Sequence, residues 1–242
     1  MRIGLLECDN VLGRFPSVEG GYREMFAALL QPHTPQLRFS YYEAWRGELP
    51  AQTDACDAWL CTGSQYSVYD KLDWIDPLQS FVKKLYREKK TFVGVCFGHQ
   101  LLAQALGGEV ARAKQGWGVG VHEMTILEPE PWMEPPLARC RLQYMHQDQV
   151  QRLPGASTVL ARAAHCEVAM FRVGDSMLGI EGHPEFTVPY SEALIRARKE
   201  RIGAERVEAA LASLAQQTDA AAVARWMLQF FTGSARRGSR SA

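Results

Sequence analysis

The sequence predicts an α/β fold with a doubly wound, mostly parallel sheet flanked by helices. Short apolar runs alternate with segments of helical periodicity through the first half of the chain, and this alternation is typical of parallel sheets. The apolar run at residues 91–93 leads through a glycine-flanked turn into a helical segment at residues 101–106. Because active sites in such sheets form at the carboxyl ends of strands, this turn indicates where a site should lie.

Each element of the first half follows from the spacing of its apolar residues. Residues 3–8, 37–41 and 58–61 are short apolar runs of strand length. Apolar side chains recur at helical spacing in two segments, residues 22–30 and 74–85. Strands and helices therefore alternate up to the glycine-flanked turn.

The second half changes character at about residue 109. Residues 119–126, 158–163 and 168–173 have the pattern of strands in an added β-hairpin region. From Pro189 onward the spacing predicts C-terminal helices, over residues 190–202, 204–216 and 219–231. We expect one domain over residues 1–232 and a flexible tail over residues 233–242.

The composition argues against several functional classes. The 242 residues include 27 basic and 27 acidic side chains, so the formal net charge is zero and neither nucleic acid nor a membrane surface is expected as a partner. The six cysteines occur singly, without the paired spacing of metal ligands. Acidic residues appear too early for a signal peptide. These features predict a cytoplasmic protein with reduced thiols.

The turn after residues 91–93 places a cysteine between two glycines. Gly94 and Gly98 lie two residues before and two residues after Cys96. This is the pattern of a nucleophile elbow, in which side chains at the flanking positions would obstruct a tight strand-to-helix turn. The amino terminus of the following helix should favour the thiolate. The alternative is a buried cysteine that only packs.

A second motif supplies a base for this nucleophile. An apolar run at residues 178–180 is followed closely by His183, Pro184 and Glu185. A neutral imidazole can accept the thiol proton, and a carboxylate on its other nitrogen fixes the tautomer. Cys96, His183 and Glu185 are therefore the candidate catalytic residues. A surface histidine at a strand end is the alternative for His183 alone.

Together the two motifs resemble those of the class I, triad-type glutamine amidotransferases. The likeness extends from residue 3 to about residue 189, and it is nearest to free-standing proteins similar to the amidotransferase domain of GMP synthase. The resemblance implies a flavodoxin-like three-layer sandwich. It also implies an oxyanion hole formed by the backbone amides of Gly63 and Phe97.

The resemblance further implies the substrate contacts. Gln100 corresponds to a glutamine that contacts substrate, and Asp148 would recognise an α-amino group. Ser64, His146 and Gln147 complete the expected binding set. The chain departs from the family at Gln147, where glycine is frequent, and at Glu181, where many members have glutamine.

The implied reaction is hydrolysis of a γ-glutamyl amide through a Cys96 thioester, without cofactor or metal. The chain has no phosphate-binding loop motif, so a separate synthetase subunit would have to receive the ammonia. A γ-glutamyl peptidase or hydrolase that acts without a synthetase is the enzymatic alternative. A non-catalytic regulatory or binding module is the second alternative.

Overall fold

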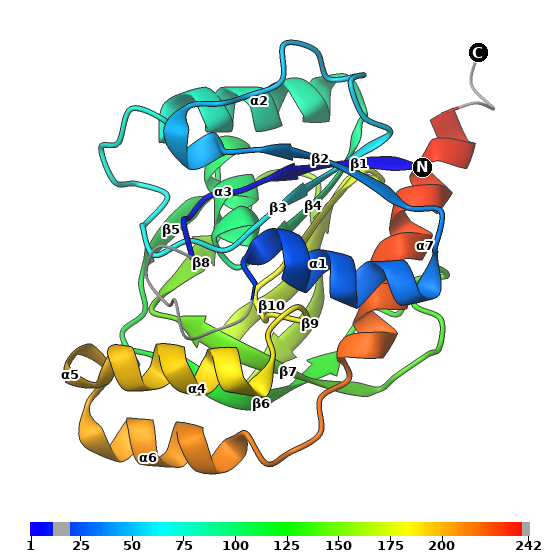
Figure 1. The fold of residues 1–242 in the computed structure, drawn as a ribbon. Coiled ribbons are helices and arrows are strands. Elements are labelled where there is room, and N and C mark those ends of the chain that lie inside the picture. The colour runs from blue at the N-terminus through cyan, green and yellow to red at the C-terminus, as the bar shows by residue number, and fades with distance from the viewer. Residues whose placement is uncertain (12–19, 239–242) are drawn as a thin grey trace.

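The fold is built on one nine-stranded sheet (Figure 1). The computed structural model describes residues 1–11 and 20–238. Five neighbouring strands are parallel and end at the same edge: β2 (Arg38–Tyr42), β1 (Arg2–Leu6), β3 (Ala58–Cys61), β4 (Thr91–Val95) and β11 (Met177–Ile180). The fold class predicted from the sequence is confirmed.

Four antiparallel strands extend the sheet beyond β11. They follow in the order β10 (Cys166–Val173), β9 (Ser157–Ala163), β6 (Gly118–Ile126) and β7 (Arg139–His146). The predicted hairpin region is thus part of the main sheet. A separate two-stranded ribbon pairs β5 (Glu109–Arg112) with β8 (Asp148–Arg152).

Helices cover both faces of the sheet (Figure 1). One face carries α1 (Tyr22–Leu30) and α7 (Ala220–Gly238), and the other carries α2 (Ile75–Arg87) and α3 (Phe97–Ala105). Successive residues of β1 supply the two cores, since Ile3 and Leu5 are buried in one and Leu6 in the other. This alternation is the period of a strand buried on both faces.

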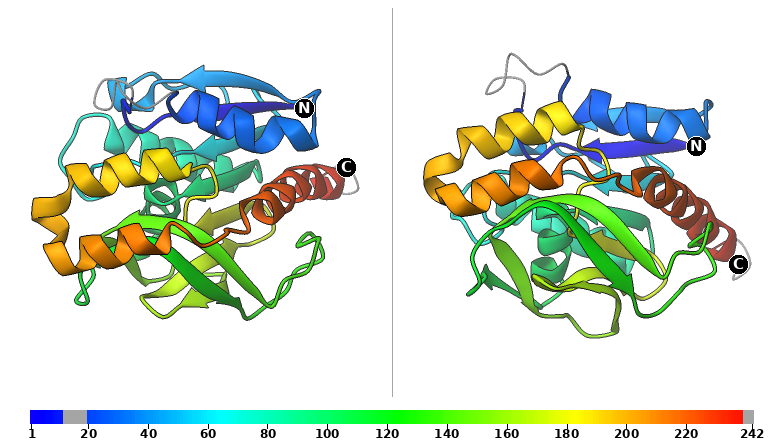
Figure 2. Two further views of the ribbon diagram at one scale, coloured as in Figure 1. Left: turned by 60° about the horizontal axis from the view of Figure 1, so that its bottom comes forward. Right: turned by 90° about the horizontal axis from the view of Figure 1, so that it is seen from below.

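A short helical layer lies against the antiparallel part of the sheet (Figure 2). It consists of α4 (Val188–Ala197), α5 (Lys199–Ile202) and α6 (Ala204–Ser213), and α6 packs directly on β6. Short 3₁₀ turns are present at Gln31–His33 and Ala44–Arg46. Within the described ranges, no helix has both the length and the apolar character needed to cross a lipid bilayer.

The structure differs from the sequence prediction at three places. The helix expected over residues 190–202 is divided at Arg198 into α4 and α5. The last helix continues to Gly238, so residues 233–238 of the expected tail are helical, and residues 239–242 lie outside the described part. The sequence pattern does not predict the strands β5, β7 and β8, because polar residues interrupt the alternation within them.

Candidate active site

The strand-to-helix turn at Cys96 has the strained geometry of a nucleophile elbow. Cys96 joins β4 to α3 with φ 50° and ψ −101°, a conformation rarely adopted by residues other than glycine. A β-carbon on Gly94 would lie 2.2 Å from the Gly98 carbonyl oxygen, and one on Gly98 would lie 2.6 Å from the Cys61 carbonyl oxygen. The backbones therefore approach too closely for any side chain at either glycine.

The electrostatics of Cys96 differ from the expectation of a stabilised thiolate. Burial raises the pKa of the Cys96 thiol well above its usual value, and the carboxylates of Glu181 and Glu185 add to this effect. The Arg198 guanidinium and a hydrogen bond from the Phe97 amide lower the pKa, but they do not offset the burial. The thiol at the free site thus needs a base to remove its proton.

His183 and Glu185 form a buried pair beside this turn. The Glu185 carboxylate lies 2.8 Å from His183 Nδ1, and the imidazole stacks on Phe186 with 3.7 Å between ring centroids. The His183 amide donates a 2.7 Å hydrogen bond to the Gln143 carbonyl oxygen, which fixes the backbone. The ring is held by its carboxylate, its stacking partner and its backbone, and Nε2 is the nitrogen left to exchange a proton.

Gly63 lies against the base and near the start of α3. A β-carbon at Gly63 would lie 2.9 Å from His183 Cε1 and 2.7 Å from Tyr22 Oη. The preceding carbonyl of Thr62 accepts a 3.2 Å hydrogen bond from the Gly98 amide, which ties this loop to α3. Gly63 and Phe97, the two predicted oxyanion residues, are therefore on loops that meet at the elbow.

A single cavity contains the predicted substrate contacts. It is lined by Cys96 and Phe97 together with Ser64, Gln100, His146, Gln147 and Asp148. The Asp148 carboxylate accepts hydrogen bonds from the hydroxyls of Ser67 and Tyr69, the latter at 3.0 Å. The structure thus brings five binding candidates together next to the nucleophile.

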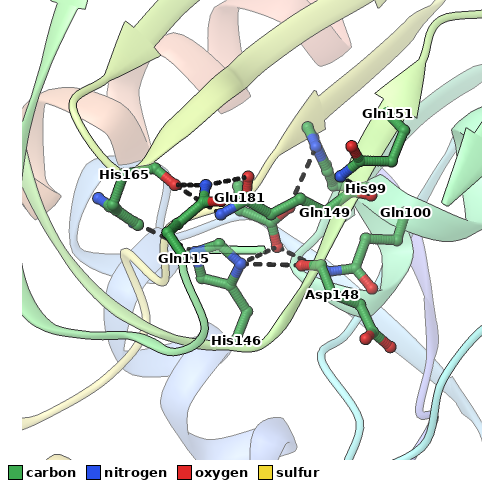
Figure 3. Close-up of polar contacts among 9 residues, drawn as sticks. All are labelled: His99, Gln100, Gln115, His146, Asp148, Gln149, Gln151, His165 and Glu181. Carbon is green, nitrogen blue, oxygen red and sulfur yellow. Dashed lines mark hydrogen bonds and ion pairs between the residues drawn. The ribbon is translucent and has the colours of Figure 1, made fainter. Parts of the chain in front are cut away.

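Glu181 is a fully buried carboxyl group behind this cavity (Figure 3). Gln100 Nε2 donates to Glu181 Oε1 at 2.9 Å and to the Asp148 carbonyl oxygen at 3.0 Å. His99 Nε2 lies 3.4 Å from Glu181 Oε2, and His146 Nδ1 lies 3.7 Å from Oε1. Burial raises the pKa of the Glu181 carboxyl well above its usual value.

The same cluster continues to a third histidine. His146 Nε2 lies 3.2 Å from His165 Nε2 in the turn between β9 and β10. Burial lowers the pKa of His99 to about 3, that of His146 to about 4 and that of His165 to about 2. Among the described residues, no group of histidine, cysteine, aspartate and glutamate side chains is arranged to hold a metal ion.

Four residues around the nucleophile are not predicted by the sequence. Tyr22 lies against Gly63, and Trp117, Arg198 and Arg201 line the cavity with Cys96. Trp117 stands among glycines, a setting that indicates packing more than contact with a ligand. The two arginines belong to a helical segment whose periodicity gives no signal of a site.

Comparisons with known proteins agree with this geometry. The family model described as "Glutamine amidotransferase class-I" matches residues 55–197. Gamma-glutamyl peptidase 4 of Arabidopsis thaliana is 36% identical over 69% of this chain and 68% of its own length. The glutamine-hydrolyzing subunit of GMP synthase from Sulfolobus acidocaldarius is 32% identical over 53% of this chain and 67% of its own.

A solved structure covers nearly the whole fold. The crystal structure of a glutamine amidotransferase from Thermotoga maritima superposes with a TM-score of 0.74 at 18% identity. The superposition covers 97% of each chain. At this identity the likeness establishes the fold.

Proposed function

The chain belongs to the class I glutamine amidotransferase family, an enzyme family with hydrolase activity, and from this premise we propose that it hydrolyses γ-glutamyl amides at Cys96. The observation that carries the proposal is the strained Cys96 elbow next to the buried pair of His183 and Glu185. The reaction is the net addition of water to a γ-glutamyl amide, which gives glutamate and an amine.

The first half of the reaction forms a thioester. His183 Nε2 takes the Cys96 proton while the sulfur bonds to the γ-carbonyl carbon, and the carbonyl oxygen becomes an oxyanion. The amides of Gly63 and Phe97 donate to that oxyanion. The protonated imidazole then gives its proton to the leaving nitrogen, and the C–N bond breaks.

The second half uses water as the nucleophile. His183 takes a proton from water, whose oxygen bonds to the thioester carbon, and the C–S bond breaks as Cys96 regains a proton. Glu185 holds the imidazole in one tautomer and stabilises its cation in both halves. The raised pKa of the free thiol makes this base essential, because little thiolate exists without it.

The glutamyl group is proposed to lie along the cavity wall. Asp148 binds the α-amino group, since its carboxylate is oriented by two hydroxyl donors. The remaining contacts are proposed from the residues that line the same cavity, namely Ser64, Gln100, His146 and Gln147.

Two relatives favour different fates for the amine. The likeness to a γ-glutamyl peptidase at 36% identity favours a self-sufficient hydrolase that releases a substituted amine. The likeness to the glutamine-hydrolyzing GMP synthase subunit favours glutamine as substrate and a separate synthetase as the receiver of ammonia. The chemistry at Cys96 is the same for both, and only the leaving group differs.

Glutamate release tests the proposal directly. We expect release from glutamine or from a γ-glutamyl dipeptide, and we expect Cys96→Ser and His183→Ala each to lower kcat/KM by at least about a thousandfold. Cys56→Ser is the matched control, because Cys56 is also buried but does not line the cavity. Its activity should equal that of the wild type.

The outcomes separate the candidates. Release that survives Cys96→Ser would contradict the thioester mechanism. Fast cleavage of the dipeptide supports a self-sufficient hydrolase, whereas slow turnover confined to glutamine supports a synthetase partner. The absence of any glutamate release, with the fold intact by circular dichroism, would favour the non-catalytic module.

A further inference from the structure

The cavity beside Cys96 carries more positive charge than a glutamyl group requires. Three arginines line it, Arg112, Arg198 and Arg201, against a single lining carboxylate, that of Asp148. A glutamyl group has one α-amino and one α-carboxylate group, so one carboxylate and one cation suffice to bind it. Two of the three arginines therefore need another explanation.

Arg112 accounts for the glutamyl end. It is the strand partner of Asp148 in the β5–β8 ribbon, so the two residues form an opposite-charge pair at one end of the cavity. This pair matches the α-carboxylate and the α-amino group of the substrate. The surplus cations are then Arg198 and Arg201, which come from the break between α4 and α5 and from α5 itself.

Arg198 and Arg201 are held at one place by a common aromatic support. Their guanidinium carbons lie 5.9 Å and 5.4 Å from the centre of the Trp117 ring. Trp117 is 9% exposed, and its indole N–H has no hydrogen-bond partner among the described residues. A guanidinium stacked on an aromatic ring can still donate its N–H groups to an anion in its plane. The arrangement has the chemistry of a carboxylate site.

Arg198 lies on the side of the nucleophile from which the amine departs. A second hollow, lined by Ser64, Met145, His183 and Arg198, adjoins the Cys96 cavity, and it does not include Asp148. The leaving amine takes its proton from His183, so it departs on the His183 side. The cations supported by Trp117 are therefore next to the leaving group, and Arg112 is with the glutamyl end.

We propose that Arg198 and Arg201, supported by Trp117, bind a carboxylate carried by the leaving amine. The preferred substrates are then γ-glutamyl amides of amino acids or peptides, ahead of glutamine and of γ-glutamyl amides with neutral amines. This inference rests on the proposed hydrolysis at Cys96, and it adds to it the residues that select the leaving group.

A pair of substrates of equal size tests the inference. γ-Glutamylglycine and γ-glutamylglycinamide differ only in the carboxylate of the leaving group. We expect the wild type to prefer γ-glutamylglycine by about 10-fold to 100-fold in kcat/KM, the range for a hydrogen-bonded charge pair. The preference should reside mainly in KM. The measured quantity is the ratio of the two kcat/KM values, because Arg198 also acts on Cys96.

Variants assign the preference to the two arginines. Arg201→Gln should lower the ratio, and the double variant Arg198→Gln with Arg201→Gln should bring it close to one. Arg201→Glu should invert it, because the new carboxylate repels the glycine carboxylate. Arg196→Gln is the matched control: Arg196 is exposed on α4, pairs with Glu192 and does not line the cavity. Its ratio should equal that of the wild type.

Failure of the inference and failure of the proposed function give different results. Cys96-dependent cleavage of both substrates at a ratio near one would overturn the carboxylate site and leave the hydrolase intact. A ratio that is high in the wild type and unchanged in Arg201→Glu would also overturn it. If neither substrate is cleaved, or if cleavage survives Cys96→Ser, both proposals are wrong.

Discussion

At the scale of single residues, Glu181 is the departure from the family that most affects the nucleophile. It follows β11 as Cys96 follows β4, and these two strands are parallel neighbours, so the two side chains lie side by side. Glutamate and glutamine have nearly the same shape, and Gln100 donates to the Oε1 atom that both would present. The chain therefore differs from a glutamine-bearing relative mainly by a titratable group next to the thiol.

The change Glu181→Gln should lower the pKa of Cys96. Charge on the Glu181 carboxylate raises the pKa of the thiol, and the substitution removes that charge while it keeps the hydrogen bond to Gln100. The pH profile of Cys96 alkylation by iodoacetamide should then move to lower pH. Mass spectrometry of the labelled peptide reads the rate at Cys96 alone.

The control for this measurement is Glu123→Gln on β6. Glu123 is paired with Arg139 and Arg141 and does not line the Cys96 cavity, so its loss should leave the profile in place. A profile that is the same for wild type and Glu181→Gln would show that Glu181 has no electrostatic influence on the nucleophile.

At the scale of secondary-structure elements, the contact between α6 and β6 positions the α4–α6 layer. Gly120 in β6 has φ +92°, and a β-carbon there would lie 2.4 Å from Ser213 Oγ and 2.9 Å from Ala210 Cα. The Ser213 hydroxyl accepts a 2.8 Å hydrogen bond from the Val121 amide and donates to the Ala210 carbonyl. The helix thus lies directly on the strand at a glycine.

Gly120→Ala should destabilise the protein through this contact. The change combines a left-handed backbone penalty of about 1–2 kcal/mol with overpacking that costs about 1–3 kcal/mol. Gly107→Ala is the matched control, because Gly107 also has φ +92° but has open space where a β-carbon would lie. It should show the backbone penalty alone.

Urea denaturation of the two variants separates the terms. The free energy of unfolding should fall further in Gly120→Ala than in Gly107→Ala. The same displacement should weaken selection of the leaving group, because α5 with Arg201 precedes α6 directly. Equal destabilisation of the two variants would show that α6 can move away from β6 without loss.

The elements also show what sequence patterns can predict. The parallel strands are uniformly apolar, as in β3 and β4, and the glycines around Cys96 have a steric requirement that a motif records. Strands such as β8, with the sequence DQVQR, have no such pattern because the ribbon faces the site with polar residues. The arginine site is beyond sequence patterns, because it depends on how a helix break places Arg198 and Arg201 over Trp117.

At the scale of the whole molecule, buried histidines connect parts of the fold that are distant in sequence. His99 is in α3, His146 ends β7 and His165 is in the turn between β9 and β10, and all three lie around Glu181 (Figure 3). Each histidine is held neutral by burial, with a pKa far below its usual value of about 6.5. This part of the core should therefore respond to acid as a unit.

The sign of that response follows from proton counts. Below about pH 6.5 the unfolded chain binds a proton on each of the three histidines and the folded protein does not, so stability is lost as pH falls. Glu181 acts in the opposite direction, because its raised pKa keeps a proton in the folded state that the unfolded chain releases above about pH 4.3. Near pH 5 the net difference from these groups is three minus one, or two protons.

We therefore expect the free energy of unfolding to fall by about 2.7 kcal/mol for each unit of pH decrease near pH 5, since each proton contributes about 1.36 kcal/mol per unit. Urea denaturation across this range measures the slope. Glu181→Gln should steepen it to three protons, because the opposing group is removed, and His165→Asn should reduce it to one. His33→Gln, at an exposed position, should leave it unchanged. A slope that is unaffected by both Glu181→Gln and His165→Asn would place the acid sensitivity outside this cluster.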